Sequence, residues 1–366
     1  MKKRILITYA TYGSGHKAVA NYIYNYLKAK DEYEIKIIDI MDYENVIGKI
    51  SKKLFEENFK HQGTFIYNSI YNMFNHKFTT LYYKEVTKSI FKNKELKEAI
   101  IGFNPDIVIS SHFFGTIISS LYKKKKLINP KIISILTDYG VHELWIKELD
   151  NINALVVGNE LIKEDLLVKG IPDNKIYSYG IPVSNKFNNY VLKKRTSNLD
   201  ILFFAGGSIG SNFSYKYFKS LIKSRLNYNI TLVCGYNDKL KNKCQKLVTK
   251  YNKNKIKVLG FTTNISELLD ECDFVITKPG GISITECMKK KRPMLLIPGN
   301  GGPEMDNLRY ICKKGYGINC KTPKKLFKTV SMLLSNRKIL NNMYKNLEKE
   351  SNNNSLENIY NLIKEY

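Results

Sequence analysis

Three of the five histidines each follow a short apolar segment typical of a buried β-strand, and these are His16, His112 and His142. The carboxyl ends of the strands in an open α/β sheet face the ligand crevice, so the three side chains could converge there. His16 opens a helix, where positive charge is disfavoured, and a neutral imidazole can act as a general base or bind a hydroxyl group. Two alternatives stay open. His16 could be a polar helix cap without a catalytic role, or the three histidines could bind a metal with Asp138, although no His-x-x-x-His pair supports this.

The turn before His16 is rich in glycine. Gly13 and Gly15 allow a tight turn and a close approach to a ligand, and the free N–H groups of the helix that follows favour negative charge. Together with Ala18, and with Asp39 about 20 residues further on, this turn also satisfies the dinucleotide fingerprint. An oxidoreductase that uses NAD or FAD is therefore a rival interpretation.

Glycine-rich loops also follow apolar segments in the second half of the chain. The backbone N–H groups of such loops suit phosphate groups. Glu286 lies one helical turn beyond Gly281, where its carboxylate could accept hydrogen bonds from ribose hydroxyls. Glu286 could instead be an exposed carboxylate on a helix, and the loop at 298–307 could be a plain glycine-rich turn. The loops lie at 206–210, 277–286 and 298–307, and the last carries Glu304, Asp306 and Asn307, which could bind sugar hydroxyls.

Short apolar segments alternate with longer amphipathic ones along most of the chain, which is the pattern of βαβ units and parallel sheets. The pattern restarts in the second half. It predicts an α/β protein with two doubly wound domains. The expected strands are 5–10, 34–40, 106–110, 131–136, 154–157, 200–205, 229–234, 255–259, 273–277 and 293–297.

A polar segment without apolar period separates the two halves and predicts a linker at 187–199. We therefore expect one domain at 1–186 and a second at 200–336. Apolar residues at helical spacing predict C-terminal helices at 337–366, which can pack back on the first domain.

The chain has 366 residues, a length typical of about two domains, and a formal net charge of +26. The charge indicates an anionic partner, a compositional bias towards lysine, or both.

From 49 to 98, aromatic residues at steps of three and four predict helices whose aromatic stripe either packs on the sheet or contacts an anionic membrane. Basic runs at 123–126 and 289–292 leave open a non-enzymatic protein that binds nucleic acid or membranes. No apolar run is long enough to cross a bilayer, and the six cysteines are expected to be free thiols.

In their order along the chain, these motifs resemble those of GT-B glycosyltransferases. The resemblance implies a GT-B fold, in which two Rossmann-like domains face a central cleft. It also implies that the domain at 1–186 binds the acceptor and associates with the membrane, and that the domain at 200–336 binds the UDP-sugar. The resemblance is to the group that includes monogalactosyldiacylglycerol synthase, the processive diacylglycerol glucosyltransferase and the N-acetylglucosaminyltransferase that makes lipid II. The motifs are Gly13–His16, Thr137–Tyr139 with His142 and Trp145, Gly180–Val183, Gly206–Gly210 and Thr277–Glu286.

The resemblance implies an inverting transfer of a hexose from a UDP-sugar to a lipid hydroxyl, with no metal and no cofactor. The expected acceptor is diacylglycerol, at the cytoplasmic face of the membrane, with peripheral binding to an anionic surface and no nucleic-acid partner. Another lipid or polyprenyl acceptor stays open, as does a UDP-sugar epimerase of the same fold. Relatives usually carry a glutamine where this chain has Pro303, so glucose, galactose and N-acetylglucosamine all remain possible donors.

A displacement of this kind needs a base for the acceptor hydroxyl. His16 is the first choice, then Asp138, while His142 or His112 would orient the acceptor or the donor. The resemblance assigns the other roles. Gly15, His112 and Trp145 would contact the acceptor. The diphosphate would lie on the loops at 206–210 and 278–281, uracil near Phe261, ribose on Glu286, and the donor sugar on Glu304 and Asn307. The full donor set is Gly207, Ser208, Phe261, Lys278, Gly280, Gly281, Ile282, Glu286, Glu304 and Asn307.

Overall fold

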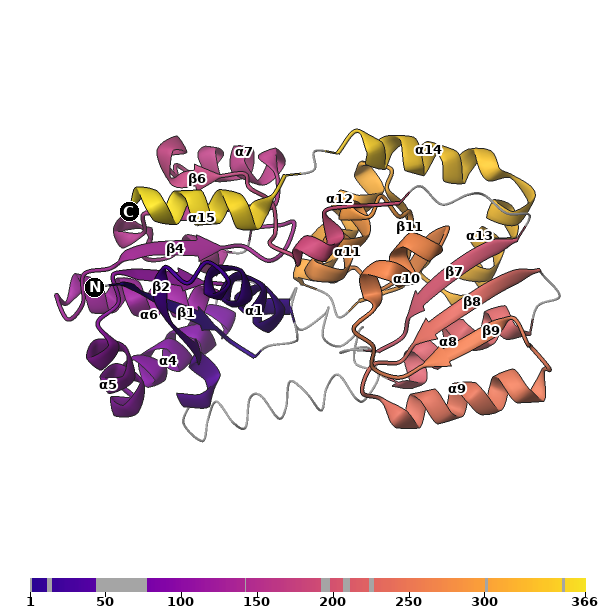
Figure 1. The fold of residues 1–366 in the computed structure, drawn as a ribbon, viewed down its shortest axis with the longest axis horizontal. Coiled ribbons are helices and arrows are strands. Elements are labelled where there is room, and N and C mark those ends of the chain that lie inside the picture. The colour runs from indigo at the N-terminus through magenta and orange to yellow at the C-terminus, as the bar shows by residue number, and fades with distance from the viewer. Residues whose placement is uncertain are drawn as a thin grey trace. The chain divides into compact units, whose positions relative to one another are not determined.

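The computed structural model of the chain is drawn as a ribbon in Figure 1. It divides into two compact units. Unit 1 contains the described residues up to Ser184 together with Asn353–Tyr366, and unit 2 contains those from Asn185 onward to Glu350. The structure describes residues 2–11, 15–43, 78–141, 143–191, 198–206, 211–223, 227–299, 302–350 and 353–366.

Unit 1 is built on a parallel sheet of six strands in the order β2-β1-β3-β4-β5-β6. The central strands are runs of β-branched and other apolar residues, such as Ile107–Ser110, in which every residue is buried. Such runs are typical of parallel strands covered on both faces. The pairing places Ile5 beside Ile35 on one side and Ile107 on the other. The strands are β1 (Lys3–Tyr9), β2 (Tyr33–Asp39), β3 (Ile107–Ser110), β4 (Lys131–Ile135), β5 (Ala154–Val156) and β6 (Ile176–Tyr177).

Helices cover this sheet, and asparagine side chains cap several of them. Asn93 and Asn159 each accept a hydrogen bond from the backbone N–H three residues further on, which fixes where α5 and α7 begin. The C-terminal helix α15 returns to unit 1, where it lies among the indigo and magenta elements in Figure 1. The helices are α1 (Gly15–Lys28), α4 (Phe78–Lys92), α5 (Lys94–Phe103), α6 (Phe113–Lys124), α7 (Glu160–Val168) and α15 (Ser355–Glu365).

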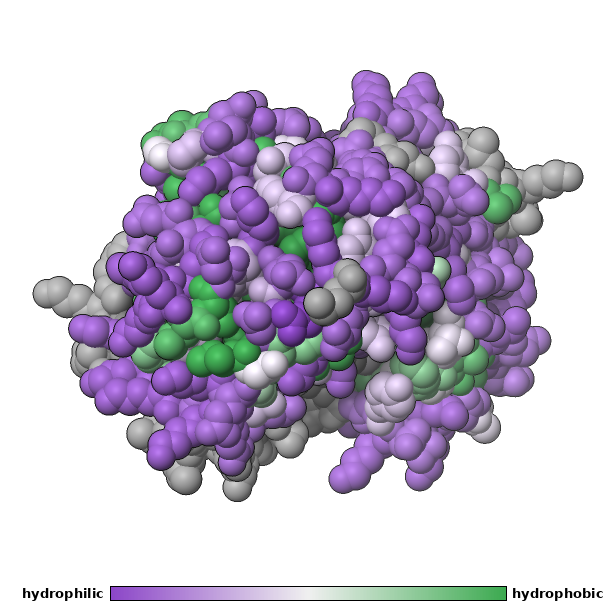
Figure 2. Space-filling view, turned by 60° about the vertical axis from the view of Figure 1, so that its left-hand side comes forward, coloured by the Kyte–Doolittle hydropathy of each residue, from purple (hydrophilic) through white to green (hydrophobic). Residues whose placement is uncertain are grey.

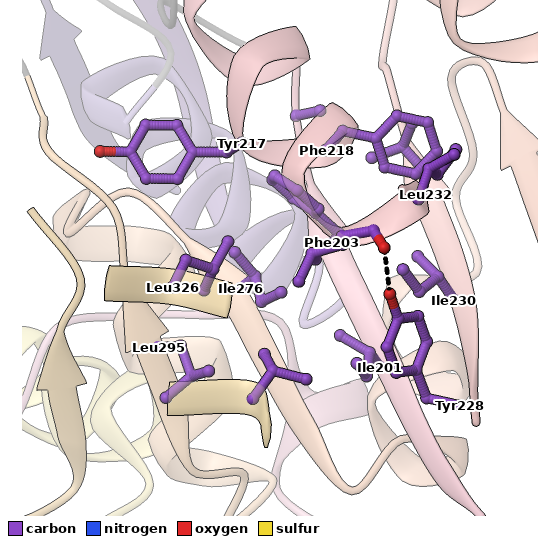
Figure 3. Packing of buried hydrophobic residues seen from close by; sticks show 14 of the residues in the cluster. Ile201, Phe203, Tyr217, Phe218, Tyr228, Ile230, Leu232, Ile276, Leu295 and Leu326 are labelled. Atoms are coloured by element: carbon purple, nitrogen blue, oxygen red, sulfur yellow. Dashed lines mark hydrogen bonds between the residues drawn. The ribbon is translucent and has the colours of Figure 1, made fainter. Parts of the chain in front are cut away.

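Unit 2 repeats the plan with a second six-stranded parallel sheet, in the order β12-β11-β10-β7-β8-β9. Its core packs Phe203 of β7 against Phe218 and Ile276, and the hydroxyl of Tyr228 donates to the Leu221 carbonyl at 2.6 Å (Figure 3). The strands are β7 (Leu199–Phe204), β8 (Tyr228–Val233), β9 (Ile256–Leu259), β10 (Phe274–Thr277), β11 (Met294–Leu296) and β12 (Gly317–Asn319). The helices are α8 (Ser211–Ile222), α9 (Asp238–Lys250), α10 (Ile265–Glu271), α11 (Gly281–Lys289), α12 (Pro303–Lys313), α13 (Pro323–Ser335) and α14 (Arg337–Glu348).

All ten strands expected from the sequence are confirmed, to within two residues at each end, and so is the two-domain α/β class. Two strands were missed, β6 and β12. They have two and three residues and lie at the edges of their sheets, so neither carries a recognisable apolar run. Of the aromatic stripe expected from 49 to 98, residues 49–77 lie outside the described part of the chain.

The beginning of the segment expected to be a linker is bound to unit 2. Phe187 is buried there, and the guanidinium of Arg292 donates to the Val191 carbonyl at 2.7 Å. Lys290 donates to the Asn189 carbonyl at 2.5 Å. All four residues of the basic run at 289–292 are buried. The run therefore does not form a surface for a polyanion, and that interpretation is wrong.

The two C-terminal helices fall in different units. Helix α14 belongs to unit 2, whereas α15 belongs to unit 1. There the Ser355 hydroxyl donates to the Tyr179 carbonyl at 2.6 Å, and the Tyr360 hydroxyl donates to Glu32 at 2.7 Å.

The surface is predominantly hydrophilic on the face shown in Figure 2, where hydrophobic residues are exposed in small separate patches. Within the described ranges, no helix has the length and apolar character needed to span a membrane. All six cysteines are free thiols, as expected.

A single glycine in α6 allows this helix to lie close to the sheet of unit 1. A Cβ atom at Gly115 would clash with the side chains of Thr8 and Ser110. We therefore expect Gly115→Ala to lower the free energy of unfolding by about 2 kcal/mol. Gly102→Ala in α5 is the control, because a Cβ there meets nothing within 4 Å. Urea unfolding of both variants measures the difference, and equal stabilities would contradict the close packing of α6.

Candidate functional site

The loops of unit 1 that carry the candidate histidines meet where the strand order reverses. The chain leaves β1 towards β2 on one side and later returns to β3 on the other side of β1. Helices α1 and α6 begin directly after β1 and β3, so their first residues lie at this switch point, where open α/β sheets bind ligands. His16 and His112 come together there, with ring centroids 4.5 Å apart and planes at 84°. The expected convergence is confirmed for these two, while His142 lies outside the described residues.

One ring nitrogen of His16 is held by the backbone. Its Nδ1 lies 2.7 Å from the Ser111 carbonyl oxygen and 3.0 Å from the Thr137 hydroxyl oxygen. A carbonyl oxygen only accepts, so Nδ1 carries the hydrogen and Nε2 keeps a lone pair. The Ser111 hydroxyl in turn donates to the His16 carbonyl at 2.9 Å. The sequence around His16 therefore builds an imidazole with a fixed orientation and a defined tautomer.

Burial keeps this imidazole uncharged. Desolvation lowers the pKa of His16 to about 4, and the hydrogen bond to Ser111 opposes the shift only in part. At neutral pH the ring is therefore neutral, and its Nε2 can take up a proton from a bound hydroxyl group.

His112 has the opposite tautomer. It caps α6, and its Nδ1 accepts a hydrogen bond from the Phe114 N–H at 3.2 Å. Because a backbone N–H only donates, neutral His112 carries its hydrogen on Nε2. The pair thus combines a ring that accepts a proton at Nε2 with one that donates a hydrogen bond at Nε2.

Aromatic side chains line the other side of His112. Its ring centroid lies 4.0 Å from that of Phe113 and 6.3 Å from that of Trp145, and both aromatic rings are buried. Trp145 comes from the short 3-10 helix Glu143–Ile146 after β4. Asp138, half-buried at the carboxyl end of β4, follows Thr137 in the same loop. Four of the expected residues of unit 1, His16, His112, Asp138 and Trp145, thus follow the carboxyl ends of β1, β3 and β4.

Asp39, which suggested a ribose-binding residue, makes its hydrogen bonds within unit 1. Its Oδ1 accepts hydrogen bonds from the N–H groups of Thr11 at 3.2 Å and Met41 at 3.0 Å, and its Oδ2 accepts one from the Thr11 hydroxyl. Both carboxylate oxygens therefore bind Thr11, which follows β1, and Oδ1 also binds Met41, which follows β2. This local role accounts for the spacing that suggested an NAD or FAD site.

Unit 2 has its own switch point, between β7 and β10. After β7, Gly206 packs against the chain at the end of β8, where an added Cβ would lie 2.6 Å from the Cys234 carbonyl oxygen. After β10, Gly280 caps α11, which begins at Gly281 with its backbone N–H groups at the same edge of the sheet. Gly207 and Ser208 lie outside the described residues.

Two candidate residues of the donor set form an ion pair across these loops. The ammonium group of Lys278 contacts the Glu304 carboxylate, and their side chains are only 18% and 15% exposed. Asn307 is buried and donates from Nδ2 to the Pro279 carbonyl at 2.9 Å, which ties α12 to the loop after β10. Pro303 occupies the first turn of α12, where a missing N–H costs nothing.

The remaining donor candidates lie along the same edge. Glu286 is nearly buried on α11, and Ile282 is half-buried one residue into that helix. Phe261, in the loop after β9, is 56% exposed and stacks on Tyr236, with centroids 4.2 Å apart. Sequence reasoning missed Tyr236; its signal was an aromatic residue in the glycine turn that follows β8. Within the described ranges, no group of three or more His, Cys, Asp or Glu residues could hold a metal ion.

Comparisons with known proteins agree with this arrangement. Residues 16–183 match the family model of monogalactosyldiacylglycerol synthase, and residues 201–359 match the glycosyltransferase family 28 C-terminal domain. A processive diacylglycerol beta-glucosyltransferase of Staphylococcus aureus strain JH9 is 28% identical over 361 residues, which cover 95% of this chain and 89% of that protein.

Solved structures show the same fold. MurG of Acinetobacter baumannii aligns over the full length of both chains with a TM-score of 0.65 and 14% identity. The S. aureus MnaA–UDP co-structure aligns with a TM-score of 0.63 and 15% identity, over 100% of this chain and 96% of that one.

The two parallel sheets, their switch-point loops and these likenesses define a glycosyltransferase with the GT-B fold. Within that class, the chain belongs to the group of monogalactosyldiacylglycerol synthase and processive diacylglycerol glucosyltransferase, with a C-terminal domain of family 28.

The lowered pKa of His16 predicts how stability depends on pH. Between pH 6.5 and 4 the unfolded chain binds a proton at His16 that the folded protein does not, so this contribution to stability is complete above pH 6.5 and is lost as the pH falls. From pH 7 to pH 5 the loss is about 2 kcal/mol. Urea unfolding of the wild type and of His16→Asn at both pH values measures it. The variant should lose that much less stability, and a parallel loss in both proteins would contradict a neutral, half-buried His16.

Proposed function

We propose that the protein transfers a hexose from a UDP-sugar to the hydroxyl group of a lipid, with diacylglycerol as the acceptor, by an inverting reaction that uses no metal ion. The observation that carries this proposal is the neutral imidazole of His16, whose Nδ1 is bound to Ser111 so that Nε2 is the proton acceptor. The name of the S. aureus relative supports the choice of acceptor.

In this mechanism His16 Nε2 takes the proton of the acceptor hydroxyl. The hydroxyl oxygen forms a bond to the anomeric carbon from the face opposite UDP, and the bond between that carbon and the diphosphate breaks. Inversion needs a single displacement, so one base is sufficient. His112, with its hydrogen on Nε2, is suited to hold the acceptor oxygen in place, and Asp138 is the second candidate for the base.

The departing UDP carries negative charge, which unit 2 can stabilise without a divalent ion. Lys278 supplies a positive charge, and the backbone N–H groups at the start of α11, from Gly281 onward, point their dipoles towards an anion. We assign Glu286 to the ribose, Phe261 to the uracil, and Glu304 and Asn307 to the hexose.

The surroundings of His112 suit a lipid more than a soluble acceptor. Phe113, Phe114 and Trp145 place aromatic rings within 4.0–6.3 Å of its own ring, so apolar groups next to the hydroxyl would find apolar contacts. The net charge of +26 supports peripheral binding to the anionic inner face of the cell membrane.

Transfer from radiolabelled UDP-glucose, UDP-galactose or UDP-N-acetylglucosamine to vesicles that contain diacylglycerol tests the proposal. We expect a labelled glycosyldiacylglycerol from one of these donors, with undiminished activity in EDTA, because the charges of Lys278 and the α11 backbone replace a metal. Loss of activity in EDTA would contradict metal independence. Labelling of a water-soluble acceptor alone, or consumption of the donor without an acceptor, would contradict the lipid assignment.

The role of His16 is tested in the same assay. His16→Gln keeps a hydrogen-bonding side chain but removes the imidazole base, so kcat should fall roughly 10²- to 10⁴-fold while UDP binding is unchanged. A fall of less than about threefold would contradict His16 as the base.

A further inference from the structure

Two exposed aromatic rings form a stacked pair at the carboxyl edge of the sheet of unit 2. Tyr236 follows β8 and Phe261 follows β9, and their ring planes lie at 14° with the centroids 4.2 Å apart. Tyr236 is 82% exposed, so most of this large side chain is in contact with water. Flat, exposed aromatic rings are surfaces on which nucleobases stack, and Phe261 is the residue that we assign to the uracil.

Backbone contacts hold the two loops of this pair side by side. The N–H of Cys234, at the end of β8, donates to the carbonyl of Leu259, at the end of β9, at 2.9 Å. Gly235 has a φ of 59°, a left-handed conformation that suits glycine, and it turns the chain from β8 towards α9. The place of Tyr236 beside Phe261 is therefore set by the backbone on both sides.

A lysine of α9 lies next to the aromatic pair. Asn237 caps this helix, with its Oδ1 accepting a hydrogen bond from the Leu240 N–H at 3.0 Å, and Lys241 comes next in the chain. The side chain of Lys241 reaches Gly260, which directly precedes Phe261, and a Cβ atom there would lie 3.7 Å from both Cδ and Nζ of the lysine. Lys241 is half-buried, and its ammonium group makes no hydrogen bond or ion pair with the described residues.

The order of the strands indicates which edge of a base would meet Lys241. The ribose and the diphosphate are assigned to α11 and to the loops after β7 and β10, which are neighbouring strands, whereas β8 and β9 lie beyond β7. A nucleotide that extends from those loops to Phe261 points the far edge of its base, opposite the ribose, towards α9. In uracil this edge carries the carbonyl oxygen O4, and in cytosine it carries an amino group.

We propose that Lys241 selects uracil over cytosine by donating a hydrogen bond to O4, while Tyr236 holds the ring of Phe261 on which the base stacks. This inference rests on the proposed function. An ammonium group only donates, so it pairs with the O4 carbonyl but meets a second donor in the amino group of cytosine. Two donors that face each other lose their hydrogen bonds to water without gaining a partner, so the cytosine nucleotide binds more weakly.

Calorimetric titration of UDP and of CDP, which differ only in the base, tests the role of Lys241. We expect the wild type to bind UDP about tenfold more tightly than CDP, and Lys241→Met to bind the two equally to within about twofold, through weaker binding of UDP. Lys246→Met removes a lysine charge from an exposed position of the same helix and should leave both affinities unchanged.

Three results would overturn the selection by Lys241. They are equal binding of UDP and CDP by the wild type, an unchanged preference in Lys241→Met, and an equal loss for both nucleotides, which would place the ammonium group on the diphosphate. Lys241→Leu, with the same expectation, replaces Lys241→Met should that variant not fold. Absence of UDP binding by the wild type would instead overturn the proposed function.

The positioning role of Tyr236 is tested with the same two nucleotides. Tyr236→Ala removes the ring that packs on Phe261, so UDP and CDP should both bind roughly five- to twentyfold more weakly, because stacking does not distinguish the bases. Tyr236→Phe keeps the ring and should bind both as the wild type does. Unchanged affinities in Tyr236→Ala, or a loss for UDP alone, would overturn this role.

Discussion

The hydrogen bond between His16 Nδ1 and the Ser111 carbonyl is the interaction on which the rest of unit 1 depends. It exists because β1 and β3 are neighbours in the sheet although almost a hundred residues separate them in the chain. The bond decides which ring nitrogen carries the hydrogen, and the burial that accompanies it keeps the ring neutral. Asp39 binds Thr11 at the end of β1, the strand that precedes α1 and His16, and Gly115 lets α6, which His112 caps, approach the sheet.

Unit 2 has the same architecture as unit 1 but presents different chemical groups at its switch point. Its switch point presents backbone N–H groups at the start of α11 and a single ammonium group, Lys278, which together suit an anion. In the proposed reaction, unit 1 supplies a neutral proton acceptor and unit 2 a positive environment, which are the two requirements of a displacement with an anionic leaving group. The likeness to the solved structures of MurG and MnaA is a likeness of scaffold, and the side chains of the loops decide the chemistry.

Much of this arrangement could be predicted from the sequence, because it depends on local patterns. Apolar runs predicted ten strands, and because the carboxyl ends of parallel strands share one edge, the meeting of His16 with His112 followed. What the sequence could not provide were partners distant along the chain. Asp39 has the spacing of a ribose-binding residue, yet its oxygens bind Thr11, 28 residues away, and only the fold reveals this. Arg292 was likewise taken for a surface charge, although it is buried against Val191.

The state of the His16 ring is the most direct test of the account. Two-dimensional ¹H–¹⁵N correlation spectra of protein labelled with ¹⁵N in histidine report which ring nitrogen is protonated, and His16→Gln identifies the resonances. The account predicts a neutral ring with its hydrogen on Nδ1 that titrates near pH 4. A hydrogen on Nε2, or titration at the ordinary histidine value of about 6.5, would contradict it.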